Sequence, residues 1–363
     1  MSLLLNTYKI PLPSPSPRAA RLQNAPMPIS RTERIALGKQ RVKNILLKHL
    51  VATMRTLEQK ISDAGPSNQR INPHLLTRAL LELEQEKKLV RLQRAGVPWF
   101  HLAQTNPQDV DSRLQVLEPI HAATVNGEFV KRLGQSLEIA VFKALRAQTS
   151  LAFFGGFRDL EEHDDDSLYS HDEPPKTVSG HTMPGKLDFM VLEGGAIGAI
   201  EIKNTRPWIY PDTSDDVLEL LRKCCATDLV PVLIARRIHY STFSVLSHCG
   251  VILHQTYNQL YPRSDAALAM QAREKNLLGY HDIRLGNEPD ARPIKFIQTN
   301  LPALLQSFRE RFERFKDLLC AYAQGEIRYK EFAGRSKRRL RGEPEDLPEF
   351  EPPDEWEIPD DYM

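Results

Sequence analysis

The sequence has few cysteines and no long hydrophobic run. Its 363 residues include only four cysteines, at Cys224, Cys225, Cys249 and Cys320, and none of them belongs to a CxxC pair. This spacing argues against a structural zinc site and predicts reduced thiols, as is usual in the cytosol. The apolar runs are too short to span a bilayer, and the N-terminus lacks the apolar core of a secretion signal. We therefore expect a cytoplasmic protein without a membrane partner.

Each end of the chain lacks charge of one sign. The first 32 residues contain no Asp or Glu, whereas residues 343–363 contain ten acidic residues and no basic one. The whole chain has a net charge of +1, so the remaining 342 residues carry +11. A basic body with an acidic tail fits a polyanionic partner. Because residues 1–30 are rich in Pro and Ser and residues 342–363 in acid, we expect both segments to be disordered.

Residues 31–103 have the pattern of a helical unit that ends in a hairpin. Helical spacing of apolar residues runs from Arg31 to about Ile61, and Asn72-Pro73 begins another helix with a cap residue and a proline. Two short strands follow, at 89–92 and 97–102. Residues 72–102 resemble the later part of a winged helix, a family in which this helix usually enters the major groove of DNA. Glutamates crowd the end of the helix, so protein docking stays open beside DNA binding.

Charged residues interrupt two otherwise apolar strands in residues 187–203. The strands read LDFMVL and IGAIEIK on either side of a Gly-Gly turn. Side chains alternate faces along a strand, so Glu201 and Lys203 point the same way, and pairing about the turn brings Asp188 to that face. Buried charges are costly unless they are paired or bind a metal. Two carboxylates suit Mg²⁺ (or Mn²⁺), and a nearby lysine can orient a water.

The elements around this hairpin follow an informative order. The pattern predicts a helix over 126–147, a strand over 149–157, the hairpin, a helix over 215–226 and a strand over 229–235, then a short helix and strand to 255. This αβββαβ order and the spacing Asp-x12-Glu-Ile-Lys resemble the PD-(D/E)xK nucleases, which have the restriction-endonuclease-like fold. Leu187 stands where that motif has its proline. The resemblance implies an α/β fold in which helices flank a mixed central sheet.

The resemblance also implies a role for each charged residue. Asp188 and Glu201 would hold one or two Mg²⁺ ions with the Ile202 carbonyl, and Lys203 would orient the attacking water. In related branches a glutamate of the first helix joins the metal site, and Glu138 stands at the matching place. The alternatives are a surface carboxylate for Glu138 and, for Lys203 and Glu201, a structural ion pair in an inactive core.

Basic, polar and aromatic residues beyond this motif are candidates for contacts with nucleic acid. Three follow the hairpin, two end the next strand, and five lie in a basic segment near the C-terminus. Solvated charges and a packed tryptophan are the alternatives. The ten candidates are Asn204, Arg206, Trp208, Arg236, Arg237, Arg335, Lys337, Arg338, Arg339 and Arg341.

These patterns divide the chain and predict its function. After the disordered start come a winged-helix-like domain at 31–103, a polar linker at 104–118 and a nuclease-like domain at 119–262; a helical extension with the basic segment at 263–341 precedes the acidic tail. We expect a Mg²⁺-dependent nuclease that hydrolyses phosphodiester bonds in DNA, as an endonuclease. The alternative is a catalytically inactive, nuclease-like regulatory protein that binds nucleic acid through its winged helix. We allow for a homodimer, for a protein partner of the tail or winged helix, and for a nucleoid location in a bacterium.

Overall fold

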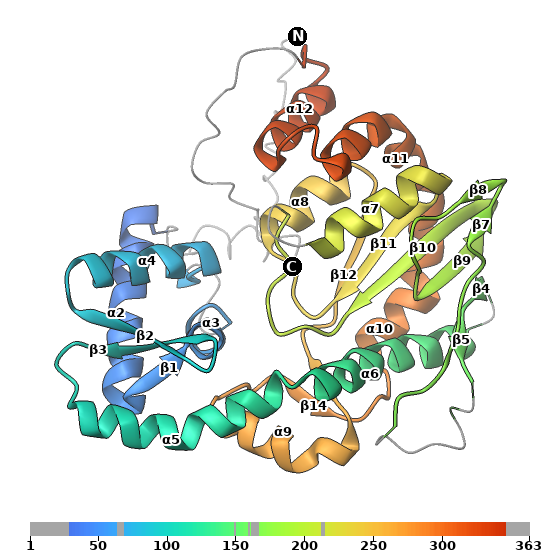
Figure 1. The fold of residues 1–363 in the computed structure, drawn as a ribbon. Helices are drawn as coiled ribbons and strands as arrows, with labels where there is room; N and C mark the ends of the chain where they lie inside the picture. Colours follow the sequence, from blue (N-terminus) through green and yellow to red (C-terminus); the bar gives the residue numbers. More distant parts are fainter. Residues whose placement is uncertain are drawn as a thin grey trace, which may run out of the picture.

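The N-terminal unit combines helices with a three-stranded sheet (Figure 1). The computed structural model describes residues 29–63, 69–148, 150–158, 160, 167–211 and 215–345, so the predicted disorder at 1–30 and 342–363 lies almost wholly outside it. The strands pair antiparallel in the order β1-β3-β2. The elements are α2 (Arg31–His49), β1 (Val51–Thr53), α3 (Met54–Ile61), α4 (Pro73–Gln85), β2 (Leu89–Arg94) and β3 (Val97–Leu102).

The single helix predicted from Arg31 to Ile61 is wrong, because the chain turns at Leu50. Ser30 and Glu33 form a capping box that starts α2. Leu50 then has a φ of +66°, which is outside the helical region, and β1 pairs with β3 directly after it. The apolar side chains of the pattern nevertheless share one core with α4. Its fully buried members include Val42, Leu46, Leu57, Ile61, Ile71 and Leu76.

Helix α5 (Pro107–Thr124) occupies most of the segment predicted as a polar linker. Its polar residues face solvent, while Val110, Leu114 and Leu117 are buried. These three side chains share a core with Trp99 of β3 and with residues of α6 (Gly127–Arg146) and α9 (Ala266–Arg273). The prediction of a linker at 104–118 is therefore wrong, and apolar packing joins the N-terminal unit to the rest of the chain.

A five-stranded mixed sheet forms the centre of the molecule. In the order β12-β11-β10-β9-β4, the first three strands are parallel and β9 is antiparallel to both of its neighbours. Helices α6, α7 and α8 flank the sheet (Figure 1), so the predicted α/β class with a mixed sheet between helices is confirmed. The elements are β4 (Ala152–Phe154), β9 (Phe189–Glu193), β10 (Ala196–Lys203), α7 (Asp215–Thr227), β11 (Val230–Ala235), α8 (Tyr240–His248) and β12 (Ile252–Gln255).

Two hydrophobic cores lie on the two faces of this sheet. Ile200 and Ile202 of β10 pack in the core that α6 shares, whereas Ala199 packs in the core of α7 and α8. The long helix α11 (Leu301–Gln324) contributes Leu305 to the first core and Phe312 to the second. Within the predicted extension at 263–341, α11 is therefore a layer of the central fold.

Shorter elements complete the described chain. The predicted strand at 149–157 is divided, because β4 joins the central sheet while β5 pairs with β6; residue 149 lies outside the described ranges. Helix α12 carries the predicted basic segment. The elements are β5 (Gly156–Phe157), β6 (His171–Asp172), β7 (Thr177–Val178), β8 (His181–Thr182), β13 (Gln259–Tyr261), η2 (Arg263–Asp265), β14 (Ile283–Leu285), α10 (Ala291–Lys295), the π-helical turn η3 (Phe296–Asn300) and α12 (Tyr329–Arg341).

A disulfide joins Cys225 of α7 to Cys320 of α11, which corrects the prediction of four reduced thiols. The two cysteines are 95 positions apart, so their spacing gave no sign that α7 and α11 pack together. Cys224 and Cys249 are free and buried.

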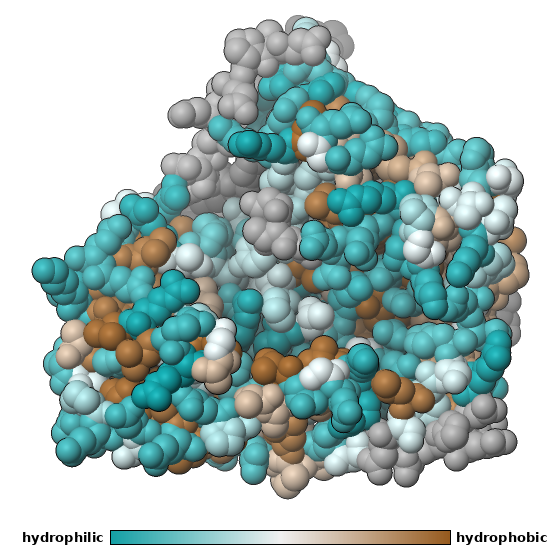
Figure 2. Space-filling model, viewed as in Figure 1, coloured by the Kyte–Doolittle hydropathy of each residue, from teal (hydrophilic) through white to brown (hydrophobic). Residues whose placement is uncertain are grey.

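The face of the molecule drawn in Figure 2 is mostly hydrophilic, with hydrophobic side chains gathered over the N-terminal unit and along the lower edge. Exposed large hydrophobic residues include Leu47 of α2, Leu81 of α4, Val116 of α5 and Met270 of α9. Within the described ranges, no helix has the length and apolar character needed to cross a membrane.

Candidate active site

Asp188 lies directly before β9, next to the end of β10. The register pairs Phe189 with Ile200, so one further step places Asp188 opposite Glu201. The backbone N–H of Ile202 donates to Asp188 Oδ2 over 2.7 Å. At Gly155, a Cβ would stand 2.6 Å from the Asp188 carbonyl oxygen, and the φ of +100° also favours glycine. The backbone on both sides therefore fixes the position of this carboxylate.

Glu201 is held between two lysines. Lys203 Nζ lies 3.0 Å from Glu201 Oε1, and Lys223 Nζ donates to Oε2 over 3.0 Å. Lys203 also lies 3.2 Å from Asp216 Oδ1. Burial alone would lower the pKa of Lys203, but Glu201 and Asp216 raise it above its ordinary value. The neighbouring carboxylates therefore favour the charged form of Lys203.

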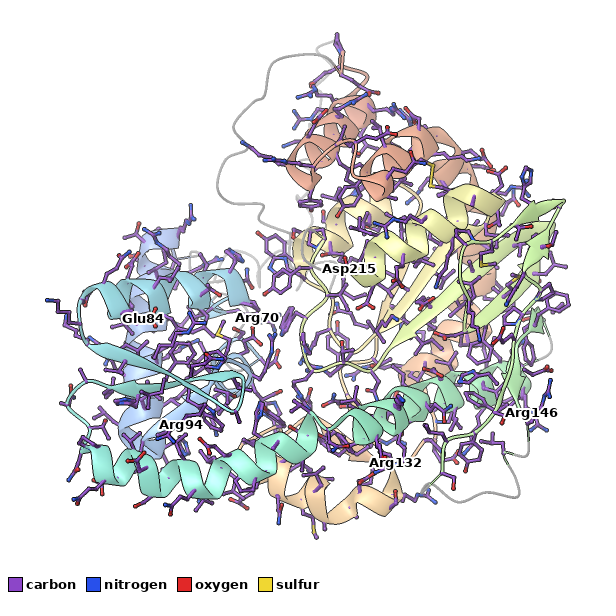
Figure 3. All side chains as sticks on the ribbon, in the orientation of Figure 1. Arg70, Glu84, Arg94, Arg132, Arg146 and Asp215 are labelled. Atoms are coloured by element: carbon purple, nitrogen blue, oxygen red, sulfur yellow. A yellow bond between two sulfur atoms is a disulfide. The ribbon has the colours of Figure 1, made fainter. Side chains whose placement is uncertain are left out.

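Glu138 reaches the same place from the middle of α6. Its Oε2 lies 3.3 Å from His171 Nε2. Gln135 fixes the neighbouring loop, because its amide bonds both the N–H and the carbonyl of Tyr169. Figure 3 labels Arg132 on α6 and Asp215 at the start of α7, the helices that supply Glu138 and Lys223.

Three carboxylates at this point repel one another. Burial raises the pKa of Glu138 to about 7, with a further increase from Glu201 and a decrease from Lys203. Burial also raises the pKa of Asp188 well above its ordinary value, and both Glu138 and Glu201 add to that shift. The four residues predicted from the sequence are thus brought together, with more negative charge than the adjacent lysines neutralise.

Three side chains of this site were missed by sequence reasoning. Lys223 and Asp216 lie on α7, and His171 begins the short strand β6. Asp216 and Lys223 are seven positions apart, so they share a helix face, and Leu220 between them is buried. A buried face that carries two charges was the available signal for α7. For His171 the signal was composition alone, because residues 163–173 are rich in acid and His, which fits metal binding but is more typical of a flexible acidic loop.

The donor atoms of the site suit a hard divalent cation. Asp188, Glu201 and Glu138 offer carboxylate oxygens, which Mg²⁺ and Mn²⁺ prefer, and a cation there would offset the repulsion that raises the pKa of Asp188. Both oxygens of Glu201 contact lysines, and within the described residues no three Asp, Glu, His or Cys side chains already form a metal-ligating group. To bind a metal ion, a carboxylate oxygen of Glu201 must therefore give up its contact with a lysine.

Three predicted nucleic-acid contacts are structural instead. Asn204 is buried; its amide donates to the carbonyls of Leu133 and Leu260 over 2.6 and 2.7 Å. Arg206 and Arg236 each lie 2.6 Å from the carboxylate of Asp282, and Arg236 is only 2% exposed. Because these groups already have partners inside the protein, the prediction that they bind phosphate is wrong.

Arg237 and Trp208 remain near the surface beside one another. The Arg237 guanidinium lies 5.7 Å from the Trp208 ring centroid and 4.8 Å from that of Tyr257, and it lies 3.5 Å from Asp63. Trp208 is half-buried, as the packing alternative expected. This stacked arrangement holds the guanidinium but leaves part of the indole accessible.

The basic segment forms α12, and the start of the acidic tail lies against it. Arg335 and Arg339 contact the carboxylate of Glu345, and Arg338 donates to the Glu345 carbonyl over 2.7 and 3.0 Å. Arg339 also bonds Asp317 of α11, and Arg341 lies 3.8 Å from Glu343. The last candidate, Lys337, is partly exposed on the same helix.

The chemistry of the site has been described from its own residues, and no similar protein adds to that description. Comparisons with protein-family models, with curated proteins and with solved structures found no match. Glu138, Asp188, Glu201 and Lys203 are therefore the basis for inferring a function.

Proposed function

We propose that the chain is a metal-dependent nuclease that hydrolyses phosphodiester bonds in DNA, acting as an endonuclease. The proposal is based on the proximity of Glu138, Asp188, Glu201 and Lys203, which lie near the start of β9 and the end of β10. The order of α6, β4, β9, β10, α7 and β11 supports it, since it is the order of a PD-(D/E)xK core. The order of the N-terminal elements likewise supports a winged helix.

The residues of the site divide the work of phosphodiester hydrolysis. A Mg²⁺ ion held by Asp188, Glu201 and Glu138 would polarise the phosphate and lower the pKa of a bound water. Lys203 Nζ, charged and 3.0 Å from Glu201, stabilises the negative charge that builds on the phosphate as the water oxygen attacks phosphorus. The attacking water would give up one proton to solvent, the P–O bond to the leaving sugar would break, and that sugar oxygen would take up a proton from solvent.

The test is cleavage of plasmid, linear and branched DNA, and of RNA, with Mg²⁺ or Mn²⁺. We expect the wild-type chain to cut DNA, and Asp188→Ala and Lys203→Ala to lose cleavage. The matched controls are Asp111→Ala and Lys186→Ala, which remove exposed charges outside the site and keep full activity. Cleavage that survives in both site variants would contradict the assignment.

The contacts of Glu201 favour a second candidate. Both of its oxygens are 3.0 Å from lysines, which is the arrangement of a structural ion pair in a nuclease-like core that binds nucleic acid without cutting it. Calorimetric titration with Mg²⁺ separates the two. The nuclease binds the ion and loses that binding in Asp188→Ala, whereas the inactive core shows no binding that depends on Asp188.

A further inference from the structure

The helix that a winged helix would place in DNA is already neutralised. On α4, Glu82 contacts Lys39 and Arg78 over 3.2 and 3.1 Å, and Glu86 contacts Lys39 and Lys88. The start of α4 is also covered, because the His74 ring lies 5.5 Å from that of His239, at the start of α8. This face therefore offers little net positive charge to a phosphate backbone.

Unneutralised positive charge gathers at a different place, where α2, α3 and α5 meet the loop after α9. We call this group the junction cluster: Lys48, Lys60, Arg113 and Lys275. Lys60 Nζ donates to the Lys275 carbonyl over 2.8 Å, and Arg113 donates to the carbonyl of Asn276. Figure 1 shows α5 below the N-terminal unit and α9 beside the end of α5 that is nearer to α6. Residues of α2, α3, α5 and the loop after α9 thus supply one patch.

The junction cluster lacks a matching set of carboxylates. In the described part of the chain, none of its four side chains has a carboxylate within ion-pairing distance, and among the charges that act most strongly on Lys60 the acidic one is Glu274. Burial lowers the pKa of Lys60, and repulsion from Lys275, Lys48 and Arg113 lowers it further. Burial and the same cations lower the pKa of the adjacent His49 to about 4. The fold holds these charges together against their repulsion.

A polyanion offsets such repulsion better than any single acidic side chain. Lys48 and Lys275 are exposed, so an outside ligand can reach the patch, while Lys60 and Arg113 are held in place by backbone carbonyls. Gly279 lets Lys60 lie against the loop, because a Cβ there would stand 2.5 Å from Nζ. Positioned cations that face outward are typical of phosphate contacts.

We propose that the junction cluster is a binding site for the phosphate backbone of DNA, and that it anchors the substrate in place of α4. The inference rests on the proposed function for the identity of the ligand. It does not rest on cleavage, because backbone binding needs neither the metal nor Asp188.

The test measures binding of a fluorescent 20-base-pair duplex by anisotropy, with the full chain in EDTA and at several salt concentrations. We expect the slope of log K against log salt to fall by about 1 in Lys60→Gln and in Lys275→Gln, and by about 2 in the double variant. Removing one of several repelling charges also leaves the melting temperature unchanged or higher.

The matched controls are Lys39→Gln and Arg78→Gln, which remove paired charges from the α2–α4 face and keep the wild-type slope. A double variant that keeps the wild-type slope of log K against log salt overturns the proposal. The proposal is also overturned if the slope falls in the two controls and not in the cluster variants. Binding of a polyglutamate peptide without binding of the duplex also overturns it. Because all of this is measured without metal, a chain that binds the duplex but never cuts it refutes the nuclease alone.

Discussion

Two groups of buried charges in this molecule have opposite electrostatics. Between the N-terminal unit and the central sheet, Arg206 and Arg236 both contact the carboxylate of Asp282. Burial raises the pKa of Asp282, but the two arginines have the larger combined effect and lower this pKa to about 2. At the candidate active site, burial and neighbouring carboxylates raise the pKa of Glu138 and of Asp188. The first group is neutralised within the chain, and the second is not.

The first arrangement is typical of a structural network, and the second is typical of a site that binds a further charge. A network that the protein satisfies by itself stabilises one arrangement of its parts. A group of buried carboxylates that repel one another lowers the stability of the folded protein. Such a group is typical of a site where a bound cation offsets the repulsion. The comparison predicts that substitutions in the two groups have opposite effects on folding stability.

The largest effect is expected at the arginine network. Asp282→Asn removes the carboxylate nearest to Arg206 and Arg236 and leaves Arg236 only Asp63, at 3.9 Å, so we expect a loss of about 3 to 5 kcal/mol in the free energy of unfolding. Urea denaturation at pH 7 measures it. Asp265→Asn is the control, since its pair with Arg132 at 3.1 Å is partly solvent-exposed and is expected to contribute less than about 1 kcal/mol.

The second prediction concerns Asp188→Asn. We expect DNA cleavage to fall by a factor on the order of 10² to 10³, because a ligand for the metal is lost. The metal-free variant should nevertheless be more stable than wild type at pH 7, since a buried carboxylate with a raised pKa no longer has to ionise. A variant that is both inactive and destabilised would place Asp188 with the structural networks.

A third prediction follows from the pKa of Glu138. Its folded-state value of about 7 lies above its ordinary value of 4.5, so metal-free protein keeps this contribution below pH 4.5 and loses it as pH rises through about 7. At 1.36 kcal/mol per pKa unit, the loss is at most about 3 kcal/mol. Stability curves from pH 4 to 8 measure it, and Glu138→Gln should flatten the slope, as should added Mg²⁺.

The smallest effect is expected at Lys223. Lys223→Met frees Glu201 Oε2 from its partner, while Lys203 still holds Oε1. We expect Mg²⁺ to bind more tightly because a competing cation is gone, and maximal cleavage to fall about tenfold because the carboxylate is less well oriented, a change of about 1.4 kcal/mol. Mg²⁺ titration of the cleavage rate measures both, and Lys223→Arg should restore most of the rate.

The sequence predicted the parts of this site that depend on local pattern. Alternation along two strands was enough to bring Asp188, Glu201 and Lys203 together, and helical spacing was enough for α6 and Glu138. The break at Leu50 was hidden, because the apolar spacing of α2 continues through α3 while the backbone turns.

Long-range partners were beyond such patterns. Arg206 and Arg236 looked like phosphate contacts because they follow strands, yet their partner Asp282 lies 76 and 46 positions away. Lys223 and Glu201, 22 positions apart, meet only because α7 packs on β10. What tertiary packing decides cannot be obtained from the spacing of charges along the chain.

Helices α5 and α6 together set the distance between the junction cluster and the candidate active site. α5 ends at Thr124 and α6 begins at Gly127, so the two helices follow one another closely along the lower part of the molecule (Figure 1). Arg113 of the junction cluster lies in α5, and Glu138 lies in α6. If a duplex is gripped at the junction cluster and cut at the candidate active site, the cut falls at a fixed offset from the grip. One residue added inside α5, between Arg113 and Thr124, would turn Arg113 about the helix axis by about 100° and shift it by about 1.5 Å relative to α6, which under the proposed function would displace the cut.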